Sequence, residues 1–253
     1  MRERRLLGLF AHPDDESRIT GGTLAKYASE GVDVSLVVAT RGEGGSCGEP
    51  PLCTTDQLPS VREAELRQAC DILGVADLTI LDYLDGTLPD VDGHELVGHF
   101  VAAIREVRPH VIVTFGPEGR TLHSDHIAVH EAATAAYDLA ADPATYPEQG
   151  LHAFATPKLY YTTLPNSLVR AVDWGFPGIP DEEVTCALDV SPWLDQKKQA
   201  TNEAHRTQAH DQPFENLPEA ERWEALSIEY FRLADTRLPH PSTSEPDLFT
   251  GIA

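Results

Sequence analysis

Short runs of apolar residues recur along the chain and alternate with longer segments whose apolar residues are spaced as on one face of a helix. Residues 61–73 and 94–108 have this helical spacing and are predicted to form helices. Strands are predicted at residues 5–11, 33–39, 78–82, 110–115 and 157–162, with a further candidate at 185–190. This alternation predicts an α/β fold, a single domain with a Rossmann-like, mostly parallel sheet and helices on both faces.

The pattern is less regular toward the end of the chain. Residues 163–184 are rich in proline and glycine, and we expect them to form an excursion over the rim of the functional site. Further on, Trp223, Leu226, Tyr230 and Leu233 have helical spacing. They predict a late helix that packs one face against the core.

The first predicted strand leads directly into a cluster of ionisable residues. The apolar run at 6–10 is followed by His12, Asp14, Asp15 and Glu16. A parallel sheet places functional groups at the carboxyl ends of its strands, and adjacent carboxylates repel one another unless a cation or a catalytic proton holds them. This cluster therefore indicates a metal site.

A second cluster is needed, because one histidine and one aspartate cannot complete a metal coordination sphere. The loop after the strand at 110–115 carries His123, Asp125 and His126, and His130 follows four residues later. Both clusters come after a strand and before a helix. We therefore expect the two strands to be neighbours at the point where the strand order reverses, so that their loops share one ion.

Six segments of the chain carry a family resemblance. They are AHPDDE at 11–16, GEGG at 42–45, VREAELRQACDILGV at 61–75, YLDGTL at 83–88, HSDHIAVH at 123–130 and KKQATNEAHRTQ at 197–208. In these motifs the chain resembles the LmbE-like (PIG-L) zinc-dependent N-deacetylases, which remove acetyl groups from amino sugars of the N-acetylglucosamine type. It departs from them at Ser124, where proline is usual, and at Leu122, where a small residue is common. Both departures are expected to change the shape of the pocket mouth.

The resemblance implies a catalytic zinc site. It assigns His12, Asp15 and His126 as ligands of one Zn²⁺ per chain, in a site that another divalent ion would also fit. Two imidazoles and one carboxylate suit zinc, which keeps a further position for water in catalytic sites. Asp14 is then the general base for this water, and His123 is the donor to the oxyanion. Either of these two residues can protonate the leaving amine.

Two more residues of the second cluster are interpreted as supporting ones. Asp125 is expected to take part in catalysis by orienting a metal-binding imidazole through its other N–H group. His130 shares a helix face with His126, and we interpret it as a structural residue in preference to a third histidine ligand.

Four residues are candidates for substrate binding. Arg62 could bind a sugar hydroxyl or a phosphate, or pair with a glutamate on the surface of its own helix. Asp85 could hydrogen-bond His123 or a sugar hydroxyl, although an Asp-Gly pair is often only a turn. His205 and Gln208 belong to the sixth motif, and the resemblance implies that they line the pocket.

Composition limits the partners and the compartment. The 253 residues carry a formal net charge of −22, which opposes binding to nucleic acid or to an anionic membrane surface. No apolar run reaches the roughly 18 residues that span a bilayer, so we expect no membrane span. The expected protein is cytoplasmic and acts on a small molecule. Cys70 and Cys186 are expected in the core, whereas Cys47 and Cys53 could pair but are interpreted as free thiols.

The expected function is zinc-dependent hydrolysis of the N-acetyl group of an N-acetylglucosamine-type amino sugar or its conjugate. The same core would attack other amides and esters, so a metal-dependent amidase or esterase with a non-sugar substrate is an alternative. A non-catalytic metal-binding module is another, although it leaves Asp14 without a role. Nucleotide binding is disfavoured, because the turn after the first strand reads HPDDES and lacks the glycine fingerprint.

Overall fold

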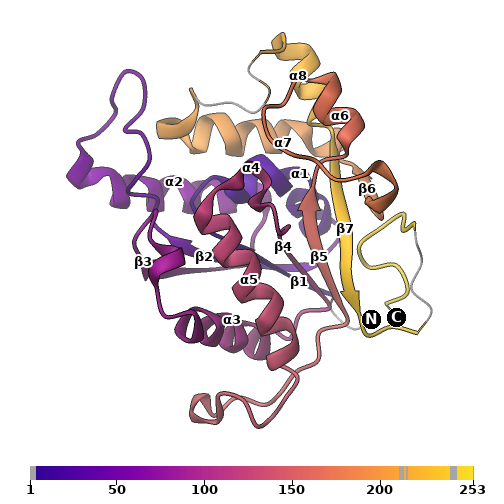
Figure 1. Ribbon diagram of the computed structural model, residues 1–253. Coiled ribbons are helices and arrows are strands. Elements are labelled where there is room, and N and C mark those ends of the chain that lie inside the picture. Colours follow the sequence, from indigo (N-terminus) through magenta and orange to yellow (C-terminus); the bar gives the residue numbers. More distant parts are fainter. Residues whose placement is uncertain (1–3, 211–213, 215, 240–243, 253) are drawn as a thin grey trace.

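The computed structural model describes residues 4–210, 214, 216–239 and 244–252. Its centre is a seven-stranded sheet with the strand order β3-β2-β1-β4-β5-β7-β6 (Figure 1). The strands are β1 (Arg5–Phe10), β2 (Asp33–Thr40), β3 (Asp77–Tyr83), β4 (Val111–Phe115), β5 (Lys158–Thr163), β6 (Cys186–Asp189) and β7 (Ile228–Thr236). The helices are α1 (Asp15–Ser29), α2 (Leu58–Leu73), α3 (Gly93–Val107), α4 (Gly119–Leu122), α5 (Ser124–Leu139), α6 (Asn166–Ala171), α7 (Leu194–Lys198) and α8 (Glu219–Ala225).

The sheet is parallel from β1 to β5 and antiparallel at its far end. β1 pairs with β2 on one side and with β4 on the other, and β4 pairs with β5. β7 runs antiparallel to both β5 and β6. The strand order therefore reverses between β1 and β4. This confirms the mostly parallel α/β sheet and the predicted pairing of the first strand with the strand of residues 110–115.

Helices cover both faces of the sheet, as predicted. α3 and α5 pack against each other on one face, and α1, α2 and α7 lie on the other (Figure 1). The two central strands, β1 and β4, are mostly apolar, and all of their residues except Arg5 are buried because both faces of the sheet are covered. Within α1, a Cβ atom on Gly22 would lie 2.4 Å from the side chain of Val190, so this glycine permits the close approach of the helix to the segment after β6.

The late helix predicted from Trp223, Leu226, Tyr230 and Leu233 is wrong in its second half. α8 ends at Ala225, and Tyr230 and Leu233 belong to strand β7. Alternation is hard to recognise in this strand because one of its buried positions is Glu229. A charged residue at a core position hides the two-residue period on which strand prediction depends.

The cysteines follow the preferred interpretation. Cys70 and Cys186 are buried, Cys47 and Cys53 are partly exposed, and all four are free thiols. In the described ranges, no helix has the length and apolar character required to cross a membrane.

Candidate metal centre and active site

A cavity of about 640 Å³ lies at the carboxyl ends of the parallel strands, where the loops after β1, β2, β3 and β4 meet. Its walls combine the two predicted ionisable clusters with a group of aromatic and arginine side chains. The lining residues are His12, Asp14, Asp15, Arg18, Ile19, Gly44, Gly45, Arg62, Asp85, Arg120, Thr121, His123, His126, Asp173, Trp174, Gly175, Phe176, Phe214 and Asn216.

The end of β4 fixes the ring of His126. Phe115, the last residue of β4, stacks on this ring with centroids 4.1 Å apart and planes 7° apart. The Nδ1 atom of His126 lies 3.0 Å from the carbonyl oxygen of Gly119. Because a carbonyl oxygen only accepts, Nδ1 carries the proton of the neutral ring, and Nε2 presents its lone pair to the cavity.

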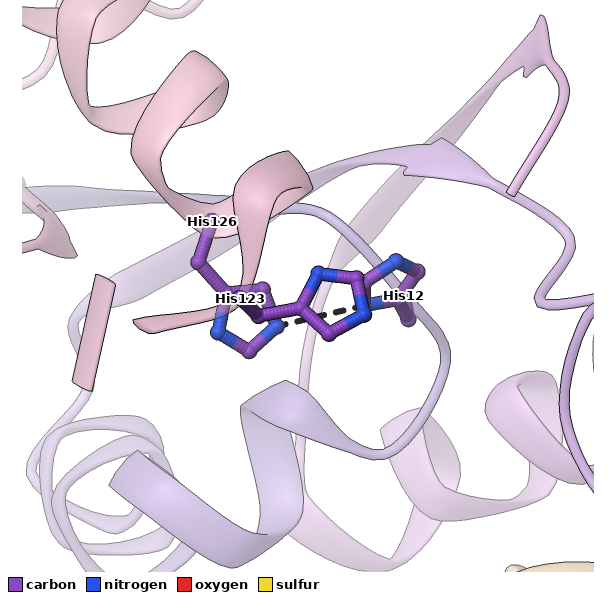
Figure 2. A group of neighbouring side chains, drawn as sticks. All are labelled: His12, His123 and His126. Atoms are coloured by element: carbon purple, nitrogen blue, oxygen red, sulfur yellow. Dashed lines mark hydrogen bonds between the residues drawn. The ribbon is translucent and has the colours of Figure 1, made fainter. Parts of the chain in front are cut away.

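In His12 the proton and the lone pair are on the opposite ring nitrogens from those in His126. Its Nε2 atom lies 3.0 Å from a carboxylate oxygen of Asp85 and 3.1 Å from one of Asp125. Ionised carboxylates only accept, so Nε2 of His12 carries the proton and Nδ1 presents a lone pair. That Nδ1 atom lies 3.2 Å from Nε2 of His126, a contact drawn as a dashed line in Figure 2. His12 belongs to the loop after β1, and His126 belongs to α5.

Asp15 completes a three-residue arrangement with the donor atoms of a cation site. Its two carboxylate oxygens lie 3.3 Å from Nε2 of His126 and 3.5 Å from Nδ1 of His12. Such separations are close to the edge of a tetrahedron whose centre is about 2.0–2.1 Å from each ligand, the usual Zn–N and Zn–O distances. Two facing lone pairs repel, and a cation between them removes that repulsion. The chemistry and spacing of these donors therefore fit zinc.

The electrostatics of the three residues agree with a site for positive charge. Burial alone would lower the pKa of His12, but hydrogen bonds with Asp125, Asp15 and Asp85 raise it well above its ordinary value, so without a metal ion the ring takes up a proton that the ion would displace. Burial alone would raise the pKa of Asp15, but the charge of His126 and the contacts with His12 lower it well below its ordinary value. The carboxylates thus remain ionised and favour a cation at this point.

His123 lies beside the same cluster, at the N-terminus of α5. Its Nδ1 atom accepts the backbone N–H of Asp125 at 3.2 Å, so this ring caps the helix and Nε2 remains for other contacts. Ring nitrogens of His12, His123 and His126 lie within 4.8 Å of one another, which makes His123 a potential ligand as well. Burial and the neighbouring histidines lower the pKa of His123.

Asp14 has a different environment from Asp15. Its backbone is in the left-handed region at φ 104°, and its N–H donates to a carboxylate oxygen of Glu16 at 2.9 Å. Its carboxylate lies 3.3 Å from Nε of Arg18 and 3.4 Å from a terminal nitrogen of Arg62. Within the described part of the chain, the Asp14 side chain contacts guanidinium groups and not the histidine pair.

Asp125 and Asp85 both act on His12. Asp125 is fully buried and accepts the backbone N–H groups of Gly86 at 2.7 Å and Leu88 at 3.1 Å. Asp85 accepts the N–H of Gly44 at 3.1 Å. The loops after β2 and β3 are thereby attached to the imidazole of His12, and Asp85 contacts this ring in place of His123.

Arg62 does not pair with the glutamates of its own helix, so that alternative is wrong. The side chain is buried and donates to the carbonyl oxygens of Gly42, at 2.6 Å, and Pro13. Glu63 binds two other arginines, and Glu65 binds Thr207. Arg62 therefore fastens the loop after β2 to the loop after β1, with one face toward the cavity.

His205 and Gln208 do not line the cavity, which contradicts the expectation from the sixth motif. The side chain of His205 is completely buried, with Nε2 2.6 Å from a carboxylate oxygen of Glu16. Gln208 donates to the carbonyl oxygen of Ser46 at 2.8 Å. The helix of the motif widens into a π-helical turn over 199–204 and ends before His205, which turns the ring toward α1. Both residues support the cavity wall from behind.

His130 also stays outside the cavity and has a structural role, as interpreted. Its Nδ1 atom lies 3.0 Å from the carbonyl oxygen of Phe115, and its ring packs edge-on against Tyr161.

Several lining residues had not been singled out from the sequence. They include Arg18 and Arg120, together with an aromatic wall of Trp174, Phe176 and Phe214. The wall could have been suspected, because two of its members lie in the segment 163–184 that was expected near the rim. Arg18 lies one turn after Asp14 on α1, a spacing that predicts the contact between them.

Several known proteins similar to this chain, some of them over nearly its whole length, are deacetylases. The profile of the PIG-L family, described as GlcNAc-PI de-N-acetylase, matches residues 7–137. The 1D-myo-inositol 2-acetamido-2-deoxy-alpha-D-glucopyranoside deacetylases of Geodermatophilus obscurus and Streptomyces avermitilis are each 36% identical, covering 98% and 99% of this chain and 98% of their own lengths. The structure of N,N'-diacetylchitobiose deacetylase from Pyrococcus horikoshii has the same fold, with a TM-score of 0.70, 20% identity and coverage of 99% of this chain and 87% of that one. The chain belongs to the PIG-L family of N-deacetylases, as the resemblance of its motifs implied.

Proposed function

We propose that this chain is a zinc-dependent hydrolase that removes the N-acetyl group from an N-acetylglucosamine-type amino sugar or its conjugate. His12, Asp15 and His126 are the proposed ligands. The observation that carries the proposal is the convergence of two imidazole lone pairs, 3.2 Å apart, beside the two oxygens of Asp15. Each imidazole donates its other N–H to a carboxylate or a carbonyl oxygen, the usual arrangement of metal-binding histidines.

The residues around the ligands have separate tasks. A bound zinc ion supplies Lewis acidity and lowers the pKa of a water molecule toward neutrality. Arg18 and Arg62 orient the carboxylate of Asp14. Asp14 accepts a proton from the water that attacks the acetamide carbonyl, and it returns this proton to the amide nitrogen as the C–N bond breaks. His123 donates to the carbonyl oxygen as that oxygen gains negative charge, through the ring nitrogen that does not cap α5.

The amino-sugar substrate is supported by the names of the similar enzymes, which act on an inositol glycoside of N-acetylglucosamine. A cavity of about 640 Å³ is large enough for such a small molecule. We propose that the protein acts in the cytoplasm, where free thiols such as its four cysteines are usual, and without a nucleic-acid partner, since its net charge of −22 repels one.

Amine release measured on a panel of substrates tests this function. The metal-free protein and the zinc-reloaded protein are each given N-acetylglucosamine, its methyl glycoside, N-acetylcyclohexylamine and an aryl acetate. We expect zinc-dependent release of amine from the sugars alone. Turnover of the non-sugar compounds without the sugars would establish the amidase or esterase alternative, and zinc binding without any turnover would establish a non-catalytic module.

A further inference from the structure

Three arginines line the cavity, and they differ in what their guanidinium groups contact. Arg18 donates to a backbone carbonyl at 2.7 Å and lies 3.3 Å from Asp14. Arg62 donates to a backbone carbonyl at 2.6 Å and lies 3.4 Å from the same carboxylate. Among the residues that the structure describes, Arg120 has neither a hydrogen bond nor an ion pair through its guanidinium group.

The backbone holds Arg120 in an unusual conformation next to the proposed metal ligands. Its φ angle is 59°, in the left-handed region that non-glycine residues rarely occupy. The carbonyl of the preceding residue, Gly119, accepts from His126, and the N–H of Leu122 donates to the carbonyl of Glu118. Contacts on both sides thus maintain a costly conformation, which is characteristic of functional positions.

The described acidic residues near Arg120 do not form an ion pair with it. Glu118 folds back over its own loop, where its carboxylate lies 2.7 Å from the position of a Cβ atom on Gly116. Glu229 binds Lys197 at 2.7 Å and two backbone N–H groups of α1. Burial lowers the pKa of Arg120 to about 10, so the group remains cationic at neutral pH. Among the described residues of the cavity wall, Arg120 is therefore the arginine whose N–H donors have no partner.

We propose that Arg120 binds an anionic group of the substrate, a phosphate ester or a carboxylate attached close to the acetylated amino sugar. The planar guanidinium group matches both anions with two parallel hydrogen bonds. The net charge of −22 and the aspartates of the metal centre oppose an anionic ligand, so such a ligand requires a local cation, whereas a neutral glycoside does not. The inference rests on the proposed function and narrows its substrate class to acidic conjugates.

The test compares three glycosides with the same acetamido sugar. These are methyl N-acetyl-α-glucosaminide, N-acetyl-α-glucosamine 1-phosphate and the carboxymethyl α-glycoside, each assayed for amine release by the zinc-loaded protein. We expect kcat/KM to be about 10- to 100-fold higher for an anionic glycoside than for the methyl glycoside, the range of a hydrogen bond to a charged group. A preference for the phosphate alone would identify a phosphate ester as the anionic group, and a preference for both anions would show that a carboxylate is also accepted.

Variants of Arg120 test whether this residue causes the preference for anionic glycosides. Arg120→Gln should abolish it while changing kcat/KM for the methyl glycoside by less than about threefold, and Arg120→Lys should retain part of it. Arg67→Gln, on the exposed surface of α2, is the matched control for net charge and should alter neither value. In the wild type, added salt should reduce the preference, which gives a readout that does not depend on a variant folding.

The outcomes separate this inference from the proposed function. Turnover of the methyl glycoside without any preference for an anion overturns the role of Arg120 and leaves the deacetylase function intact. An equal loss on neutral and anionic glycosides in Arg120→Gln overturns it as well. If none of the three glycosides releases amine, the proposed function is wrong and the inference falls with it.

Discussion

Two histidine–carboxylate clusters lie within this chain, one open to the cavity and one sealed behind it. In the open cluster, Nδ1 of His12 and Nε2 of His126 point toward each other, and the carboxylate of Asp15 lies beside both atoms. In the sealed cluster, His205 and Glu16 form one hydrogen bond of 2.6 Å, and both side chains are fully buried. Neither residue of the sealed pair lines the cavity, and among the described residues Nδ1 of His205 is buried without a partner, whereas the open cluster directs two ring nitrogens and a carboxylate at one point of the cavity wall.

The difference shows that histidine and carboxylate in one motif do not by themselves define a site. What distinguishes the open cluster is the direction of its lone pairs, which second contacts to carbonyl and carboxylate oxygens determine. The sealed pair nonetheless serves the open one, because Glu16 also accepts the N–H of Asp14 and so holds that residue in its left-handed conformation. In the proposed mechanism, the open cluster performs the chemistry and the sealed pair maintains its geometry.

The largest effect is expected from removing a lone pair of the open cluster. His126→Ala should lose most bound zinc and reduce deacetylation to the level of the metal-free protein, while circular dichroism shows a retained fold. Metal analysis after dialysis measures this. His130→Ala is the matched control, on the same helix and outside the cluster, and should keep its zinc. Full occupancy in His126→Ala would contradict the ligand assignment.

The next effect separates chemistry from metal binding. Asp14→Asn should retain zinc and lose about 10²- to 10⁴-fold in kcat, the usual scale for a general acid–base residue. Stopped amine-release assays on zinc-loaded protein measure the loss. Asp15→Asn differs by one position and should lose zinc instead. Near-native turnover by Asp14→Asn would remove Asp14 from the mechanism.

Removal of His123 should reduce kcat somewhat less than removal of the Asp14 carboxylate. His123→Ala is expected to keep zinc and lose about 10²- to 10³-fold in kcat, the scale for one lost oxyanion donor. His123→Gln, which retains a donor, should recover part of the rate. Loss of zinc in both variants would instead make His123 a ligand, a role that its distance from the other two rings permits.

The open cluster was predictable from the sequence to a large extent, and the sealed pair was not. Strand-like runs directly before the two ionisable clusters predicted both strands, and the switch-point rule then predicted their pairing. His205 was misplaced because its direction depends on a π-helical turn that has no signature in residue type. Glu229 hid β7 for a related reason, since its buried partner Lys197 is 32 residues away along the chain. Contacts of this kind are visible only once the fold is known.

The strength of the sealed pair itself can be measured through the stability of the protein. His205→Leu leaves the Glu16 carboxylate buried without its partner and should lower the free energy of unfolding by about 3–5 kcal/mol, measured in urea on metal-free protein. Burial alone would lower the pKa of His205, but Glu16 raises it overall. A raised pKa in the folded state means that the contribution is complete below the unfolded value of about 6.5 and is lost as pH rises through the folded value. The difference between wild type and variant should therefore shrink from pH 6 to pH 10, and a difference that grows would contradict the charged pair.

The smallest effect should come from an ion pair of similar length on the surface. Arg67 lies 2.8 Å from Glu63, close to the separation in the sealed pair, but its side chain is 57% exposed. Water already solvates both groups when they are apart, so Arg67→Gln should change the free energy of unfolding by about 0.5 kcal/mol or less. Glu63 also keeps its contact with Arg41 in this variant. Urea unfolding of Arg67→Gln beside His205→Leu therefore tests whether burial, and not the distance between charged atoms, sets the strength of the two pairs. If Arg67→Gln lost as much unfolding free energy as His205→Leu, burial would not be what sets the strength of the two pairs.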